Sequence, residues 1–554
     1  MKSKKIFALT MACMMGIGAF AGCAKKKDSI TDYTFFACMP GKEINDGNEI
    51  QAEIAKLTGV RVKETWITGQ EPAEAVGSMV VTGELPDFID GGDGSDQLYE
   101  AGVLVAWDDY LAKDEYKNLK EMYSDKEWDM FRKPDGKIYW ANVFQNTYGE
   151  SKATGHNDEA FWIQVRVLEW AGYPKLETMD DYFGLLERYY AENKTNADGT
   201  AIIPYTALCE GWRYFCIENA PQFLDGYPND GSVIVQLEGV DKPTIVDYNT
   251  TPTAKRYFSK LNEIYNKNLM DPDFAAMTYD DYMAKLASGA VLGMCDQWWD
   301  FAFTVNDKFK AAGYDELGYN YVPFGLTIEA GMKNHWHTYG DTLNSASGIA
   351  VTTKCKNPDK AFTFLARCLD QDIHDLRFWG IKGTDYLVDD QGLYYRTEEM
   401  RNNWADADFQ AKHCCAYSYF PQYGGTSRDG KNAMNPGEQT SEFFATLADP
   451  LVKCFEAYGY TTYGDFLQSE HDEMGFWFPM YSYSNNMSTK TDGGAAWAKM
   501  GDCKHEWLPK VVMASDFEAT WAEYMDAYNA CKPEDFLAEM QVELDRRVEM
   551  GKDA

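Results

Sequence analysis

The sequence predicts an α/β fold, because strand-like runs alternate with amphipathic helices along the chain. The first of these are a strand at Tyr33–Met39, a helix at Glu49–Thr58, a strand at Val60–Trp66, a helix at Glu71–Val81 and a strand at Leu85–Ile89. This order predicts mostly parallel strands joined by crossover helices. The composition, 45% hydrophobic and 25% charged, is that of a globular protein, and 554 residues indicate several domains.

Two helices can be placed together with their ends. Glu49–Thr58 has apolar residues at helical spacing and is followed by Gly59, which suits a left-handed C-cap. Met179–Glu192 is amphipathic, and Thr178 or Asp180 is its predicted N-cap.

The stretch Gly289–Asp300, reading GAVLGMCDQWWD, combines an apolar run with a polar and aromatic end. A short apolar run bounded by glycine predicts a buried strand, as does the earlier run Phe161–Leu168. At its end stand Asp296, Gln297, Trp298 and Trp299. Sugars are bound by aromatic faces and by planar polar groups that take their hydroxyls. We therefore predict a sugar site here, with Trp298 as the preferred contact, against the alternative of two core tryptophans.

The N-terminal segment predicts export and lipid attachment. Three lysines near the start precede fifteen uncharged residues, Ile6–Phe20, and then Ala21-Gly22-Cys23. A basic region, a short apolar region and a small-residue site are typical of a signal peptide, and fifteen residues are too few to span a membrane. We predict a signal at 1–22, a lipidated Cys23, a polar tether at 23–30, and a body held outside the cytoplasmic membrane.

Charge and cysteine content exclude some classes of function. A formal charge of −35 repels phosphate backbones, so no nucleic-acid partner is expected. Thirteen cysteines show no small-scaffold disulfide spacing. Cys414-Cys415, Cys503-x-His505 and His335-x-His337 each lack the further ligands of a zinc site. Asn193–Thr200 lacks the alternating oxygen ligands of a calcium loop and predicts a turn. No metal and no cofactor are predicted.

Several segments resemble the extracellular solute-binding proteins of bacterial sugar importers, family 1 of the maltose-binding-protein superfamily. The resemblance lies in IAKLTGV (54–60), TGELPDFI (82–89), VRVLEWAGYPKLETMDDYFGLL (165–186), GAVLGMCDQWWD (289–300) and SGIAVTTKCKNPDKAFTFLARCLD (347–370). The segments at 380–395 and 516–547 resemble the long-chain Gram-positive lipoprotein branch of this family. In that family, the equivalent of Asp87 turns the third strand and caps backbone groups.

The resemblance implies a type II fold of two α/β lobes with ligand bound between them at a hinge. Lobe one would comprise residues 31–145 and 349–425, and lobe two residues 146–348 and 426–554. It also implies a non-enzymatic, monomeric binding protein that delivers a carbohydrate, in particular an oligosaccharide, to ABC permease subunits. Further ligand contacts are expected from loops at strand ends, although each residue could equally be a core or surface residue. They are Trp66, Asp90, Asn146, Trp212, Arg213, Trp336, His337, Tyr339 and Asp341.

The sequence also leaves other functions open. A surface carbohydrate hydrolase would need two carboxylates, which Asp296 and Asp300 could supply. A non-sugar solute such as a peptide and a purely structural lipoprotein also stay open. The Gly-x-Ser-x-Gly and His-Glu-x-x-His motifs are absent. Gly425–Lys431 has phosphate-loop spacing, but Asn432 follows where Ser or Thr is required, so it predicts a turn.

Overall fold

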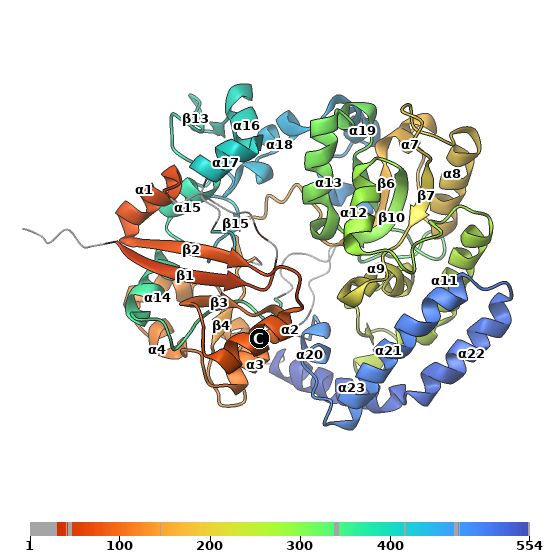
Figure 1. Ribbon diagram of the computed structural model, residues 1–554, viewed down its shortest axis with the longest axis horizontal. Helices are drawn as coiled ribbons and strands as arrows, with labels where there is room; N and C mark the ends of the chain where they lie inside the picture. The colour runs from red at the N-terminus through yellow and green to blue at the C-terminus, as the bar shows by residue number, and fades with distance from the viewer. Residues whose placement is uncertain are drawn as a thin grey trace, which may run out of the picture.

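The computed structural model describes residues 30–39, 41, 47–144, 146–336, 343–414, 417–469, 475 and 477–551. These residues form two lobes, each built around its own β-sheet and flanked by helices (Figure 1). The predicted two-lobed α/β architecture is confirmed. The predicted signal peptide, Cys23 and most of the predicted tether lie outside the described residues.

Lobe one contains a five-stranded sheet in the order β2-β1-β3-β12-β4. The strands are β1 Thr31–Ala37, β2 Val60–Trp66, β3 Phe88–Asp90, β4 Trp140–Ala141 and β12 Ile349–Val351. β1 runs parallel to β2 and β3, whereas β12 lies antiparallel between β3 and β4. Ala37 pairs with both Trp66 and Asp90, so the carboxyl ends of the three parallel strands meet at one edge.

Lobe two contains a four-stranded sheet in the order β11-β6-β10-β7. The strands are β6 Glu159–Gln164, β7 Ile203–Thr206, β10 Val291–Gln297 and β11 Tyr321–Phe324. β10 is parallel to β7, but β6 is antiparallel to both β10 and β11. In each sheet one strand runs opposite to the others, β12 in lobe one and β6 in lobe two. Most strands of each sheet therefore share one direction, as predicted, although the sheets are mixed.

Helices cover both sheets. In lobe one they are α1 Glu49–Thr58, α2 Pro72–Thr82, α3 Ser95–Glu100, α4 Asp108–Leu111, α5 Lys117–Lys120, α6 Asp125–Met130, α14 Pro358–Arg367, α15 Gln371–Phe378, α16 Glu398–Ala405 and α17 Ala407–His413. In lobe two they are α7 Val165–Trp170, α8 Met179–Glu192, α9 Phe215–Glu218, α10 Ala220–Leu224, α11 Pro252–Asn266, α12 Tyr279–Ala287, α13 Trp298–Ala312, α19 Asp449–Tyr458, α20 Tyr481–Ser484, α21 Asp492–Val512, α22 Phe517–Ala530 and α23 Pro533–Gly551. α18, Thr440–Thr446, follows the last crossing between the lobes.

Local sequence explains the helix ends that were predicted. α1 ends at Gly59 with a φ of 71°, a left-handed conformation that glycine adopts without strain. α8 begins after Thr178, whose hydroxyl accepts from the backbone N–H of Asp181 while the Asp181 carboxylate accepts from the Thr178 N–H. Phe161–Leu168 is only half strand, because β6 ends at Gln164 and α7 begins at Val165.

Three short predictions can be compared directly with the structure. The carboxylate of Asp87 accepts from the backbone N–H and the hydroxyl of Thr34, at 2.8 and 2.9 Å, so it caps a strand as expected. Gly425–Lys431 begins at the end of a strand and contains the predicted turn, in which the N–H of Gly430 donates to the carbonyl of Ser427 at 2.9 Å. Asn193–Thr200 is also a turn.

Each lobe has a separate apolar core. One core draws on residues 33–143 and 343–434, and the other on residues 160–336 and 443–544. The short strands β5 Thr147–Tyr148 and β15 Gly424–Gly425 pair in parallel where two connecting segments run side by side. The predicted lobe limits stay a proposal, and the cores follow them except at Leu343 and Met434, which pack in the core of lobe one. Among the described residues, no helix is both long and apolar enough to cross a membrane.

Candidate functional site

Two tryptophans from distant parts of the chain stack on one another in lobe two. Trp212 lies in the 3-10 helix η3, Gly211–Tyr214, and Trp299 is the second residue of α13. Their ring centroids are 5.6 Å apart and their planes differ by 15°. The Trp212 side chain is 42% exposed, so the stack, here called the tryptophan platform, reaches solvent. Phe215 packs against both rings, with its ring centroid 5.9 Å from that of Trp212 and 6.2 Å from that of Trp299.

Arg213 packs against the tryptophan platform and adds a charged group beside it. Its guanidinium carbon lies 4.3 Å from the ring centroid of Trp212 and 3.8 Å from that of Tyr279. Its Nε donates to Oδ1 of Asp300 at 2.9 Å. An arginine clamped by two rings and a carboxylate is fixed in direction, which suits it to present its remaining N–H groups to a ligand.

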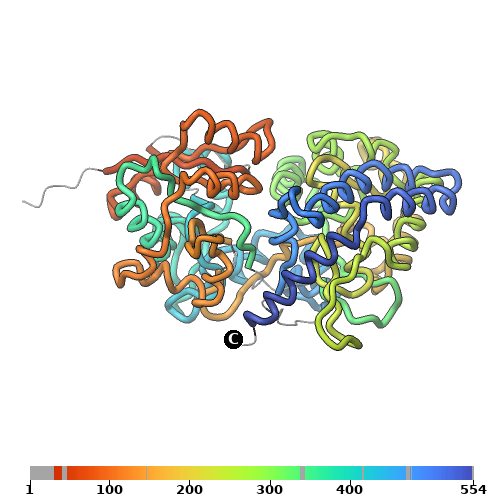
Figure 2. The backbone as a smooth tube through the Cα atoms, turned by 90° about the horizontal axis from the view of Figure 1, so that it is seen from below, coloured from red at the N-terminus to blue at the C-terminus, as the bar shows by residue number. Residues whose placement is uncertain are grey.

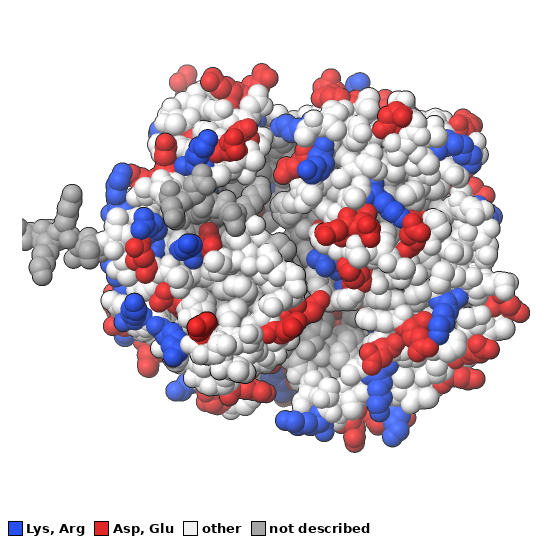
Figure 3. Space-filling model, viewed as in Figure 1, with Lys and Arg blue, Asp and Glu red and all other residues white. Residues whose placement is uncertain are grey.

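The tryptophan platform lies on the side of lobe two that faces lobe one. α13 stands on that side in both views (Figures 1 and 2), and the surface is hollowed between the lobes (Figure 3). Glu71, directly before α2 of lobe one, approaches Gly211, where an added Cβ would lie 3.9 Å from its Oε1. Trp212 and Arg213 are therefore next to the opposite lobe.

Asp296 does not face the space between the lobes, which corrects the sequence prediction. It is fully buried, and β10 is buried along nearly its whole length. Its Oδ2 accepts from the hydroxyl of Tyr282 at 2.6 Å, and its Oδ1 accepts from the backbone N–H of Gln297 at 2.7 Å. Burial, with the nearby charge of Asp300, raises the pKa of Asp296 well above its usual value. In this conformation Asp296 stabilises the strand end and cannot reach a ligand.

Of the residues that follow Asp296, Gln297 and Trp299 contribute to the tryptophan platform, whereas Trp298 packs elsewhere. The side-chain oxygen of Gln297 accepts from the indole N–H of Trp299, which fixes that ring in the platform. Trp298 packs edge-on against Phe303 at 4.7 Å. The geometry thus places Trp299, rather than the favoured Trp298, beside Trp212.

Lobe one presents a second aromatic group at the carboxyl edge of its sheet. Trp66 lies 5.2 Å from Tyr419, which is also 5.2 Å from the half-exposed Phe144. Asp90 is at the same edge but is only 6% exposed and accepts from the backbone N–H of Gly92. Burial raises the pKa of Asp90 to about 6.

Glu64 is a functional candidate that sequence reasoning missed. It precedes Trp66 by two residues on β2, so both side chains lie on the same face. Both of its carboxylate oxygens are buried. Burial raises the pKa of Glu64 to about 8, and the backbone of Tyr417 and the charge of Arg377 offset this only in part. Period-two alternation on a strand could have identified the Glu64 and Trp66 pair.

The other predicted ligand contacts are either buried or lie outside the described residues. Trp336 is fully buried, stacked on Phe223 at 3.9 Å, with its indole N–H donating to the carbonyl of Leu326 at 2.6 Å. It is a core residue, which corrects the prediction. Asn146 is 5% exposed and donates to the carbonyl of Gln422. His337, Tyr339 and Asp341 lie outside the described residues.

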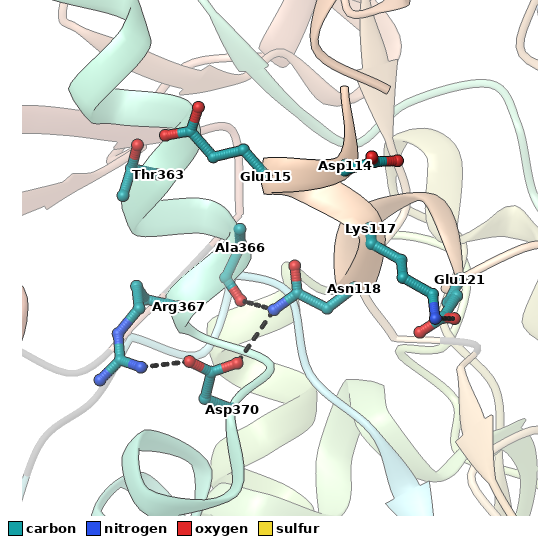
Figure 4. Close-up of a pocket in the computed structure, with 9 residues that line it drawn as sticks. All are labelled: Asp114, Glu115, Lys117, Asn118, Glu121, Thr363, Ala366, Arg367 and Asp370. Atoms are coloured by element: carbon teal, nitrogen blue, oxygen red, sulfur yellow. Dashed lines mark hydrogen bonds and ion pairs between the residues drawn. The ribbon is translucent and has the colours of Figure 1, made fainter. Parts of the chain in front are cut away.

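A shallow pocket of about 310 Å³ lies away from this region, between α5 and α14 of lobe one (Figure 4). Its polar groups pair with each other. Asn118 donates to the carbonyl of Ala366 at 2.6 Å and to Asp370 at 3.0 Å, and Arg367 pairs with the same Asp370. The polar groups of this pocket therefore join α5 to α14 and its following loop, and we do not regard the pocket as the ligand site.

Comparison with known proteins identifies the class of fold. No family model matches the chain. Lipoprotein LipO of Bacillus subtilis (strain 168) is 21% identical over 420 residues, covering 72% of this chain and 76% of LipO. Among solved structures, the HMO binding ABC-transporter associated solute binding protein of Bifidobacterium longum infantis has a TM-score of 0.63 at 13% identity, covering 93% of this chain and 98% of that chain.

A second solved structure gives the same result. The S. pneumoniae ABC-transporter substrate binding protein FusA in complex with kestose has a TM-score of 0.60 at 16% identity, covering 93% of this chain and 99% of that chain. The chain has the fold of the two-lobed solute-binding proteins. These neighbours are binding proteins rather than enzymes.

Proposed function

We propose that this protein is the substrate-binding component of an ABC importer and that it captures a carbohydrate between its two lobes. The observation that carries the proposal is the tryptophan platform with Arg213 at its side, on the face of lobe two directed at lobe one. The fold supports it, because the similar FusA structure contains kestose and a second similar protein is described as HMO binding.

The chemistry of the platform fits a sugar ring. The C–H faces of the sugar ring would pack on Trp212 and Trp299, and the sugar hydroxyls would accept hydrogen bonds from the guanidinium of Arg213. Trp66 and Tyr419 of lobe one would close on the opposite face. Ligand contacts from both lobes would favour a closed form, since a ligand shifts the equilibrium toward the form that it binds more tightly.

The location proposed is the outer face of the cytoplasmic membrane. The signal-like segment before Cys23 and the similarity to the lipoprotein LipO support lipid attachment at that cysteine. The partners are then the membrane permease subunits, the lipid bilayer and the sugar, and the protein acts as a monomer. No catalytic step is required for this role.

Equilibrium binding to a panel of oligosaccharides tests the proposal. We expect saturable binding to at least one glycan, together with a smaller radius of gyration in solution scattering when that glycan is present. Saturable binding to peptides but to no glycan would show that the ligand is a peptide and would overturn the carbohydrate proposal. A scattering profile that stays the same with bound ligand would argue against closure.

A carbohydrate hydrolase is the second candidate, and the structure offers it little support. Asp296 is fully buried, and Asp300 is 2% exposed at its side chain and paired with Arg213. Neither carboxylate is open to a glycosidic bond. We expect no new reducing ends when the protein is incubated with any glycan that it binds, and their appearance would establish the enzyme instead.

A further inference from the structure

Three potential metal ligands converge beneath the tryptophan platform. They are the thiol of Cys216 on α9, the carboxylate of Asp296 near the end of β10 and the carboxylate of Asp300 in the first turn of α13. One donor atom from each lies within 4.8 Å of the other two, and all three residues are buried. These residues come from segments up to 84 positions apart (Cys216 to Asp300), so the cluster is a product of the tertiary fold.

One atom of this cluster has no partner. Asp300 accepts from Arg213 with Oδ1, but its Oδ2 is buried and makes no hydrogen bond, and the side chain is only 2% exposed. A buried polar atom without a partner is costly, so its presence in a folded protein calls for an explanation such as a bound ion.

We propose that Cys216, Asp296 and Asp300 form a binding site for a divalent cation of the zinc type. The set combines one sulfur with two oxygen donors, which suits Zn²⁺ and disfavours Ca²⁺ and Mg²⁺, since these require oxygen ligands alone. Three protein ligands leave a fourth position for water.

The distances within the cluster are compatible with such an ion. Cys216 Sγ lies 3.3 Å from Oδ1 of Asp296, where the thiol donates a hydrogen bond. At a tetrahedral zinc, bonds of about 2.3 Å to sulfur and 2.1 Å to oxygen place these donors about 3.6 Å apart. Donor atoms that now lie within 4.8 Å of one another would therefore move together by up to about 1.2 Å when the ion binds. On binding, the thiol loses its proton to solvent and the sulfur bonds to the metal instead.

The surrounding groups would hold the ligands in place. Tyr282 donates to Oδ2 of Asp296, and Arg213 donates to Oδ1 of Asp300, which leaves Oδ2 of Asp300 free to bind an ion. Hydrogen bonds of this kind orient carboxylate ligands in metal sites.

A metal here would also join the two segments that carry the tryptophan platform. Cys216 follows η3 with Trp212, and Asp296 and Asp300 flank Trp299. The ion would therefore fix the distance between the two rings. This consequence rests on the proposed function, whereas the metal site itself does not.

The test uses the full mature chain, purified in a reductant that does not bind metals and freed of metal by a chelator. Zn²⁺ is titrated by calorimetry, and Co²⁺ is titrated by absorbance to detect a thiolate-to-cobalt charge-transfer band. We expect one ion per chain and a charge-transfer band. Cys216→Ser should abolish the band and weaken Zn²⁺ binding at least tenfold, and Asp300→Asn should weaken it to a similar degree.

The matched control is Cys454→Ser, which changes another fully buried cysteine of lobe two on α19. It should keep both the stoichiometry and the band. Absence of stoichiometric binding of either metal by folded wild-type protein overturns the site, as does unchanged binding in Cys216→Ser or Asp300→Asn. If Cys216→Ser does not fold, the cobalt spectrum of the wild-type protein and the zinc affinity of Asp300→Asn test the site. Glycan binding is measured separately, so a failure of the carbohydrate proposal does not affect the interpretation of metal binding.

Discussion

Arg213 and Asp300 form an ion pair, 2.9 Å from Nε to Oδ1, that links η3 to the first turn of α13. The side chains are 17% and 2% exposed, so the pair is largely removed from water. The same arginine lies against Trp212 and Tyr279. The pair therefore connects the stability of lobe two to the geometry of the tryptophan platform.

Arg213→Ala should destabilise the protein by about 3–5 kcal/mol, because it leaves the buried carboxylate of Asp300 without its countercharge. Urea denaturation of the purified chain measures this loss. Lys242→Ala, which removes an exposed pair with Asp545, is the matched control and should cost less than about 1 kcal/mol. Equal, small effects in the two variants would mean that the Arg213 pair is effectively solvated.

Trp212→Ala and Trp299→Ala should each weaken glycan binding about tenfold or more, since an aromatic face contributes about 0.5–1.5 kcal/mol beyond its buried area. Titration calorimetry with the glycan found in the panel measures the change. Trp170→Ala removes another partly exposed indole of lobe two, packed on Tyr189, and should leave affinity unchanged. Wild-type affinity in both platform variants would remove the proposed site.

Trp336→Ala should cost about 3–5 kcal/mol of unfolding free energy, because the ring is fully buried and stacked on Phe223. Thermal and urea unfolding measure this loss. The folded fraction should still bind glycan normally, which separates this residue from the platform. A specific loss of affinity with normal stability would restore Trp336 as a ligand contact.

Glu64→Gln should change how stability depends on pH. In the folded protein the pKa of Glu64 is about 8, above the ordinary value of 4.5, so between these values the folded state keeps a proton that the unfolded state has lost. This contribution is complete below pH 4.5 and is lost as the pH rises toward 8. The variant lacks it, so its stability relative to wild type should increase from pH 5 to pH 8.

Melting temperatures of the two proteins across this range give the measurement. Glu84→Gln changes an exposed carboxylate of the same lobe and serves as the control. Parallel pH curves for wild type and Glu64→Gln would show that Glu64 is ionised in the folded state.

The sequence predicted those features that depend on short segments. The ends of α1 and α8 follow from Gly59 and Thr178, which act on backbone groups a few residues away. The apolar run before Asp296 correctly indicated a buried strand. The alternation of strands and helices indicated the fold class, although it did not reveal which strands run antiparallel.

Features that depend on tertiary contacts could not be predicted in this way. The direction of Asp296 was hidden because β10 is buried on both faces, so its sequence carries no alternation that separates inside from outside. The pairing of Trp212 with Trp299 joins residues 87 positions apart, and that of Trp66 with Tyr419 joins residues 353 apart. Only the fold brings these rings together.

The strand order has a consequence for how the chain folds. In lobe one, β12 lies between β3 and β4, and in lobe two, β10 lies between β6 and β7. Both neighbours of each of these strands come earlier in the chain, by more than 80 residues. Until β12 arrives, β3 and β4 each keep an open hydrogen-bonding edge, which is prone to pairing with other chains. The sheet of lobe one therefore cannot be completed before residue 351 is synthesised, and shorter nascent chains should need protection from aggregation.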